Sequence, residues 1–107
     1  LFEELVGSLF ANSPLGEDGY PIHESVRKII EKYNSKELRQ EFIAAEINKR
    51  GLHSSNAGKS ERELANKYYE IAKALEIDYP ETASIFYSLG EFYDEESLQQ
   101  RIAAENE

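Results

Sequence analysis

The side chains best suited to chemistry are concentrated in residues 46–62, where cations, carboxylates and a titratable ring alternate. Glu46 precedes Arg50 by four residues, which is the favourable order for an ion pair on one helical face. A predicted helix also begins near residue 60, and the amides of its first turn carry the positive end of the helix dipole. The candidate anion- or partner-binding site consists of Glu46, Arg50, His53, Lys59, Glu61 and Arg62.

This patch is positive on a chain that is otherwise acidic, and its charge suggests two uses. It could dock the acidic C-terminal segment or bind an external anion, and the charge balance favours docking. Gly58-Lys59-Ser60 resembles only the end of a phosphate-binding loop, and no predicted strand precedes it. The sequence therefore gives no complete phosphate-binding motif.

Glu46 also lies between two apolar groups of its predicted helix. A half-buried carboxylate in such a position is costly unless it is paired. We expect it to pair with Arg50 or Arg39 and so tie helices together. The alternative is a polar cleft closed by residues 51–59, where a carboxylate with a perturbed pKa could bind or transform a ligand.

These residues do not form a recognisable catalytic, metal-binding or cofactor-binding motif. His23 and His53 are the two histidines, and neither has a second ligand at helical spacing. Cysteine is absent, which excludes disulfides, thiolate ligands and cysteine nucleophiles. We therefore predict no catalytic residue, no metal ligand and no cofactor, and an enzyme is the less favoured class.

Length and charge set the broad class of the protein. The 107 residues predict one helical domain over 1–107, and the net charge is −9. Residues 1–24 have acids but no lysine or arginine, residues 25–75 have a positive excess, and residues 76–107 have a strong negative excess. The net charge argues against nucleic acid as a partner. No apolar run approaches about 18 residues, so no membrane span is predicted, and a cytoplasmic location fits the lack of cysteine.

Apolar residues recur at helical spacing in five segments. Pro21 suits the first turn of the second helix, and Ser35 can cap the third. Ser60 and Glu63 form a capping box for the fourth. The predicted helices span residues 1–11, 21–33, 35–50, 60–76 and 80–94, with an extension of the last to 104 as the alternative to a break after Tyr93.

These segments predict an all-α protein, a compact bundle of four to five helices. The link between the last two helices is about three residues long, which favours a C-terminal antiparallel αα-hairpin. The predicted core of this hairpin consists of Leu64, Tyr68, Ile71, Phe86, Leu89 and Tyr93.

Both ends of the chain have apolar residues without an obvious home in this bundle. The apolar face of the fifth helix does not continue past Tyr93, and Leu98 and Ile102 fall on another side. Leu1 and Phe2 lie at the opposite end of the chain. Because exposed apolar surface often marks an interface, we expect a homodimer built partly from these residues.

Four short motifs resemble a group of uncharacterised bacterial helical proteins. In this chain they read Asp18-Gly19-Tyr20-Pro21; Asn48, Arg50 and Gly51; Gly58, Glu61, Arg62, Leu64, Ala65 and Tyr68; and Tyr79, Pro80, Thr82 and Ala83. The resemblance covers about residues 18–93 and implies one bacterial helical domain. It implies no activity, and it places Arg50 and Glu61-Arg62 on either side of one loop.

A weaker resemblance concerns a single hairpin. Pro80-Glu81-Thr82-Ala83, followed by Leu89-Gly90 and Tyr93, resembles the junction between tetratricopeptide repeats. No second copy occurs in the chain, and such arrays need about three repeats to bury a core. The resemblance implies one hairpin of that geometry rather than a repeat array.

Three functions follow from these observations. A non-catalytic protein-interaction or regulatory module is favoured, because no catalytic constellation is present. An acidic immunity- or antitoxin-type protein that neutralises a basic partner is the first alternative. A small-ligand binder or enzyme that uses residues 46–62 is the second. The expected partner is a protein, which includes a second copy of the chain.

Overall fold

The computed structural model describes residues 12–50 and 58–106, and within them the chain forms four α-helices and no strand. The helices are α2 (Glu24–Tyr33), α3 (Lys36–Arg50), α4 (Lys59–Leu75) and α5 (Pro80–Glu105). This architecture confirms the all-α prediction. The helix predicted over residues 1–11 lies outside the described residues.

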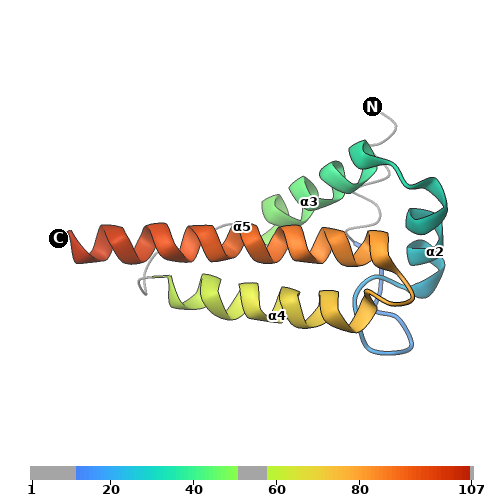
Figure 1. Ribbon diagram of the computed structural model, residues 1–107, viewed down its shortest axis with the longest axis horizontal. Helices are drawn as coiled ribbons and strands as arrows, with labels where there is room; N and C mark the ends of the chain where they lie inside the picture. The colour runs from blue at the N-terminus through green and yellow to red at the C-terminus, as the bar shows by residue number, and fades with distance from the viewer. Residues whose placement is uncertain (1–11, 51–57, 107) are drawn as a thin grey trace.

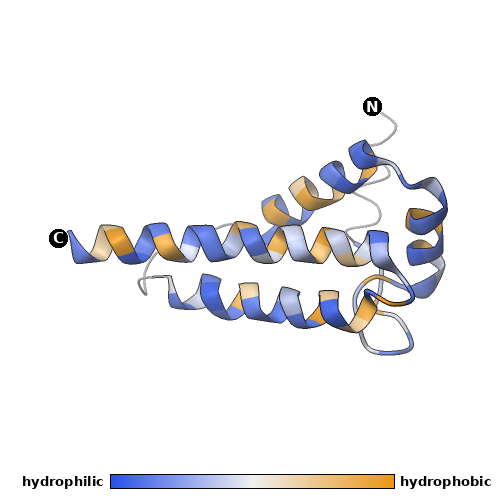
Figure 2. Cartoon of the chain, in the orientation of Figure 1, coloured by the Kyte–Doolittle hydropathy of each residue, from blue (hydrophilic) through white to orange (hydrophobic). Residues whose placement is uncertain are grey.

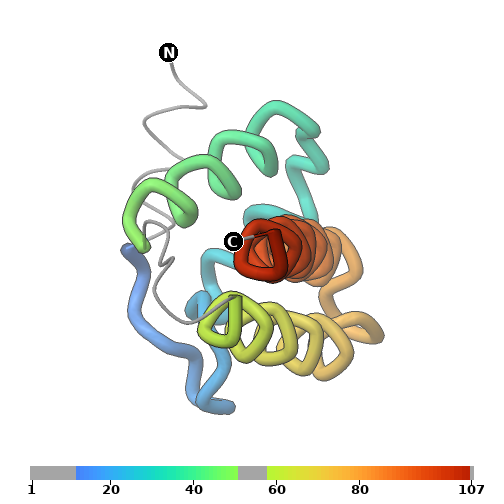
Figure 3. The backbone as a smooth tube through the Cα atoms, turned by 90° about the vertical axis from the view of Figure 1, so that its left-hand side faces the viewer, coloured from blue at the N-terminus to red at the C-terminus, as the bar shows by residue number. Residues whose placement is uncertain are grey.

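The longest helix, α5, is the centre of the arrangement. Figure 1 shows α4 and α5 side by side and running in opposite directions. Viewed along α5 in Figure 3, α3 lies on one side of it and α4 on the other. Contacts at both ends of the pair agree with this view, because the Ser97 hydroxyl donates to the Gly58 carbonyl at 2.9 Å and the Tyr87 hydroxyl donates to Glu76 at 2.8 Å.

The short helix α2 crosses one end of the bundle and caps α5 (Figure 1). The Glu31 carboxylate accepts from the amides of Glu81 and Thr82 at 3.0 and 2.7 Å and from the Thr82 hydroxyl at 2.9 Å. The first amides of a helix have no partner within it, so this carboxylate satisfies two of them and faces the positive end of the dipole. Arg39 of α3 adds an ion pair to Glu81 at 3.1 Å.

The core is apolar and lies between α5 and the other three helices. Figure 2 shows hydrophobic residues recurring along α3, α4 and α5 between hydrophilic turns. The buried cluster consists of Ile22, Ile30, Phe42, Ala65, Tyr68, Ile71, Ala72, Leu75, Ala83, Ile85, Phe86, Leu89 and Tyr93. It contains the predicted hairpin core except Leu64, which is half-buried. Ile29 and Tyr33 of α2 are exposed.

Two of the predicted helix starts are wrong. Helix α2 begins at Glu24, with His23 as its cap, so Pro21 lies before the helix; the His23 ring nitrogen accepts from the Ser25 amide at 3.2 Å. Helix α4 begins at Lys59 with Gly58 as its N-cap, so Ser60 lies inside the first turn and is not the N-cap residue of a capping box. The cap of α2 is thus local, whereas α4 starts at a contact with a distant part of the chain.

The contact that sets the start of α4 is between two backbones. Gly58 has φ +85°, and a Cβ at this position would collide with the Ser97 carbonyl of α5. A glycine is therefore required where these two backbone segments touch. The predicted cap at Ser35 is confirmed, because its hydroxyl accepts from the Leu38 amide at 3.1 Å. Of the two alternatives for the last helix, the structure shows the extension, since α5 continues past residue 94 to Glu105 without a break.

A buried cation anchors the loop before α2. The Arg27 side chain has no exposed surface and forms two hydrogen bonds to the Asp18 carboxylate, at 2.8 and 2.9 Å. It also donates to the Tyr20 carbonyl at 2.8 Å, and its guanidinium lies 5.2 Å from the centre of the Tyr79 ring. These bonds fasten residues 18–20 to α2 and to the turn between α4 and α5. They also lower the pKa of Asp18 from 3.8 to about 2.

Replacing Asp18 tests this anchor. We expect Asp18→Asn to lower the free energy of unfolding by about 3 kcal/mol at neutral pH, because it leaves a buried guanidinium without its counter-charge. The matched control is Asp78→Asn, at an exposed aspartate in the turn between α4 and α5, which should change it by less than about 0.5 kcal/mol.

The same pair predicts a response to pH. Because the pKa of Asp18 is lower in the folded protein, its stabilisation is complete above about pH 4 and is lost as the pH falls toward about 2. Asp18→Asn should lack this part of the acid-induced loss. Urea denaturation across that pH range measures the free energy of unfolding and its dependence on pH. Equal losses of this free energy in Asp18→Asn and Asp78→Asn would contradict the anchoring role of Asp18.

The central packing of α5 gives a second prediction. Leu89 is 0% exposed, so Leu89→Ala should lower the free energy of unfolding by about 2–5 kcal/mol through lost burial and a residual cavity. Ile77→Ala, at a side chain that is 89% exposed, is the control and should have little effect. A loss below about 1 kcal/mol for Leu89→Ala in chemical denaturation would show that this side chain is not packed.

Candidate functional site

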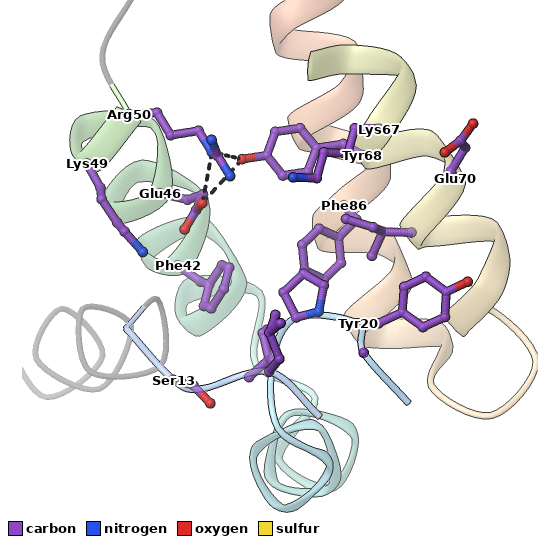
Figure 4. A pocket seen from close by; sticks show the side chains of 15 residues that line it. Ser13, Tyr20, Phe42, Glu46, Lys49, Arg50, Lys67, Tyr68, Glu70 and Phe86 are labelled. Atoms are coloured by element: carbon purple, nitrogen blue, oxygen red, sulfur yellow. Dashed lines mark hydrogen bonds and ion pairs between the residues drawn. The ribbon is translucent and has the colours of Figure 1, made fainter. Parts of the chain in front are cut away.

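A pocket of about 460 Å³ lies between the loop of residues 13–22, α3 and α4, with α5 beneath it (Figure 4). Its floor is apolar and consists of Ile22, Phe42, Ile71 and Phe86, each at most 5% exposed. Phe42 and Phe86 meet edge to face, with ring centres 6.5 Å apart. The floor is thus part of the packed core and would hold its shape when the pocket is filled.

The loop side of the pocket presents exposed apolar groups. Leu15 is 60% exposed and Tyr20 is 38% exposed, and both line the pocket. Apolar side chains are normally scattered singly on a surface, whereas here two of them border an apolar hollow. The loop that carries them is the segment held by Arg27 through Asp18.

Charged side chains border the other sides. Lys49 and Arg50 come from the last turn of α3, and Lys67 and Glu70 come from the exposed side of α4 (Figure 4). Among the described residues, the pocket lining contains three cations and two carboxylates, the second being Glu46. The net charge of these residues is positive, in contrast to the chain as a whole.

One hydrogen-bonded cluster connects α3 and α4 at the edge of this pocket. The Arg50 Nε donates to the Tyr68 hydroxyl at 2.6 Å and lies 3.2 Å from Glu46 Oε1. The Tyr68 hydroxyl donates to the same carboxylate oxygen at 3.2 Å (Figure 4). The predicted ion pair of Glu46 with Arg50 is confirmed, whereas Arg39 instead binds Glu81.

The electrostatics of this cluster keep Tyr68 protonated and Arg50 charged. Burial, followed by the nearby Glu46 carboxylate, raises the pKa of Tyr68 well above its usual range, so the hydroxyl stays protonated. Burial lowers the pKa of Arg50, but Tyr68 and Glu46 outweigh it and the net shift is upward. A protonated tyrosine between a cation and a carboxylate can position both, and it is poorly suited to act as a base or nucleophile.

The six residues of the candidate site do not meet at one place. Glu46 and Arg50 line the pocket, whereas Arg62 lines a separate groove of about 420 Å³ between α4 and α5. Glu61 is 1% exposed and faces the interior, and Lys59 is exposed at the start of α4. The sixth, His53, lies outside the described residues.

The two arginines of the candidate site differ in their relation to the acidic C-terminal segment that was predicted to dock there. Arg62 shares its groove with three acids of α5, namely Glu91, Asp94 and Glu95. Arg50 is held by Glu46 and the Tyr68 hydroxyl instead. One arginine therefore faces the acidic segment, and the other belongs to the pocket.

Sequence reasoning missed several residues of the pocket. Tyr68 was expected only in the core, and nothing local to it indicates that its hydroxyl reaches α3. Lys49 and Lys67 looked like ordinary surface lysines, because only the fold brings their helices to one hollow. The one available signal was Tyr20 in the loop, an aromatic residue between a glycine and a proline.

A scan against protein-family models, a search of the curated proteins and a search of the solved structures each found no match. The resemblance to bacterial helical proteins thus stays a prediction. Among its motif residues, Gly19, Tyr20, Pro21, Arg50 and Tyr68 come from three separate segments and all line the pocket.

The hydroxyl of Tyr68 can be removed without changing the ring. We expect Tyr68→Phe to lower the free energy of unfolding by about 1–2 kcal/mol, because Arg50 and Glu46 lose a shared partner in a half-buried site. The matched control is Tyr87→Phe, which deletes an exposed hydrogen bond to Glu76 and should cost less than about 0.5 kcal/mol. If both variants lower the free energy of unfolding equally in denaturant, the Tyr68 hydroxyl stabilises the fold no more than a surface hydrogen bond does.

Proposed function

We propose that this chain is a non-catalytic protein-interaction module whose pocket receives an apolar side chain from an acidic segment of a partner. The observation that carries the proposal is the combination of an apolar floor, an exposed Leu15 and Tyr20 at the rim, and a cationic border. Such a combination suits an anchor residue flanked by carboxylates.

The shape of the pocket supports an anchor of this kind. A volume of about 460 Å³ could accommodate one large side chain and its neighbours. Interfaces concentrate their binding energy in such anchors, which fill preformed apolar hollows and exclude water. Tyr20 and Leu15 would then cover the anchor and lose their own exposure to water.

The charge of the rim supports an acidic partner segment. Lys49 stands on one side of the pocket and Lys67 on another, so carboxylates before and after the anchor would each meet a cation (Figure 4). The rest of the chain carries a large negative charge and would repel such a segment elsewhere. Electrostatic complementarity would thus direct the partner to this pocket.

The chemistry of the lining supports a binding role over catalysis. Tyr68 is held protonated, and Arg50 and Glu46 neutralise each other. The Ser13 hydroxyl, also in the lining, accepts from the His23 amide at 3.2 Å and donates to the Pro14 carbonyl at 3.2 Å. These polar groups are engaged in holding the pocket together.

Selection of peptides from a random displayed library on the purified chain tests the proposal. We expect the selected peptides to share an aromatic residue or leucine with aspartate or glutamate on both sides. Their affinity, measured by fluorescence anisotropy, should fall at least tenfold for Lys49→Glu combined with Lys67→Glu, and should fall with added salt.

The control variant is Lys73→Glu, which changes an exposed lysine of α4 outside the pocket. It should leave the affinity within about twofold. Peptides that bind the pocket variant as well as they bind the original chain would overturn the proposal. Selection of basic peptides that bind through the acidic residues of α5 would favour the immunity-type function instead.

A further inference from the structure

Aromatic rings border the pocket on several sides. Phe42 and Phe86 lie on its floor with ring centres 6.5 Å apart, and the Tyr68 ring stacks on Phe86 with centres 6.0 Å apart. Tyr20 adds a ring at the rim, where it is half-buried. Aromatic pairs that meet edge to face or with an offset gain more than burial alone provides. A hollow bordered by these rings therefore favours an aromatic anchor over an aliphatic one.

The polar neighbour of these rings is the Glu46 carboxylate. Glu46 follows Phe42 by four residues, so it lies on the same face of α3, about 6 Å further along the helix axis. Figure 4 shows its carboxylate between Arg50 and the Phe42 ring. The side chain is 11% exposed and lines the pocket, so a bound group can reach it. An aromatic ring that rests on Phe42 would thus have its outer edge close to this carboxylate.

The two oxygens of the Glu46 carboxylate differ in their contacts. The Arg50 Nε and the Tyr68 hydroxyl both lie 3.2 Å from Oε1. Within residues 12–50 and 58–106, no donor forms a hydrogen bond to Oε2. An ionised carboxylate accepts hydrogen bonds and donates none. The pocket therefore offers an acceptor at the edge of an apolar floor.

The surrounding charges select the kind of donor that suits this acceptor. Arg50 already compensates the charge of Glu46, and Lys49 and Lys67 border the same pocket, so a cationic anchor would meet three cations. A serine or threonine would be too small to cover the apolar floor. A phenol or an indole covers such a floor and has a neutral O–H or N–H at its edge.

We propose that the anchor of the partner is a tyrosine or tryptophan whose O–H or N–H donates to Glu46 Oε2. This inference rests on the proposed function, because it names the side chain that the pocket receives. Glu46 is then the residue that determines specificity. Phenylalanine and leucine would cover the same floor but would leave this acceptor without the hydrogen bond. A hydrogen bond to a charged group is among the stronger ones in proteins, so the donor sets the preference.

A double-mutant cycle between peptide and protein tests this hydrogen bond. The peptides share one sequence with aspartate and glutamate on both sides of a single anchor. The anchor is tyrosine or phenylalanine in one pair. In the other pair it is tryptophan or benzothienylalanine, in which sulfur replaces the N–H. Fluorescence anisotropy measures the affinity of each peptide for the original chain and for Glu46→Gln.

In at least one pair, the original chain should bind the peptide with the donor at least tenfold more tightly than the peptide without it. This pair identifies the anchor. Glu46→Gln should reduce the preference to about twofold or less, because the amide oxygen stays with Arg50 and Tyr68 and the amide NH2 then faces the donor. Structural damage in this variant would instead weaken both peptides of a pair alike and leave their ratio unchanged.

The matched control is Glu70→Gln, which removes another carboxylate of the pocket lining and should leave the preference within about twofold of that of the original chain. Equal affinities within both pairs for the original chain would overturn this inference and leave the proposed function standing. A preference that persists in Glu46→Gln would also overturn it. Failure of all four peptides to bind would overturn both this inference and the proposed function.

Discussion

Arg27 carries a positive charge in a position without exposed surface, and two other parts of the fold depend on how that charge is satisfied. Asp18 and the Tyr20 carbonyl hold the loop before α2 against it, and Tyr79 places the turn between α4 and α5 over it. Removal of one partner would leave a buried charge uncompensated, which is far more costly than loss of a surface pair. The loop that walls the pocket is therefore fixed by an ion pair outside the pocket.

The helices themselves could be predicted from the sequence because their signals are local. Apolar spacing identified all four described segments, Ser35 was a correct cap, and Glu46 with Arg50 formed the pair that four-residue spacing favours. The start of α4 was predicted incorrectly at Ser60. Its position follows from the approach of Gly58 to α5, a contact between residues 39 positions apart.

The candidate site was harder to predict for the same reason. A stretch of alternating charges in the sequence suggested one positive patch, but helical geometry sends Glu61 inward and Arg62 to the groove beside α5. The pocket instead combines the end of α3, the middle of α4 and the loop before α2. The Tyr68 ring packs in the core, and its hydroxyl belongs to the polar cluster with Arg50 and Glu46. Apolar spacing in the sequence predicts only the packing of the ring.

The cap that Glu31 places on α5 has a consequence for the order of folding. Helices α4 and α5 are neighbours in sequence, so they can associate early, before loop closure brings α2 to them. The first turn of α5 acquires its partner only when Glu31 arrives from α2, across a separation of 50 and 51 residues. Hydrogen exchange at the amides of Glu81 and Thr82 thus reports the docking of α2, whereas amides in the middle of α5 report the unfolding of the whole bundle.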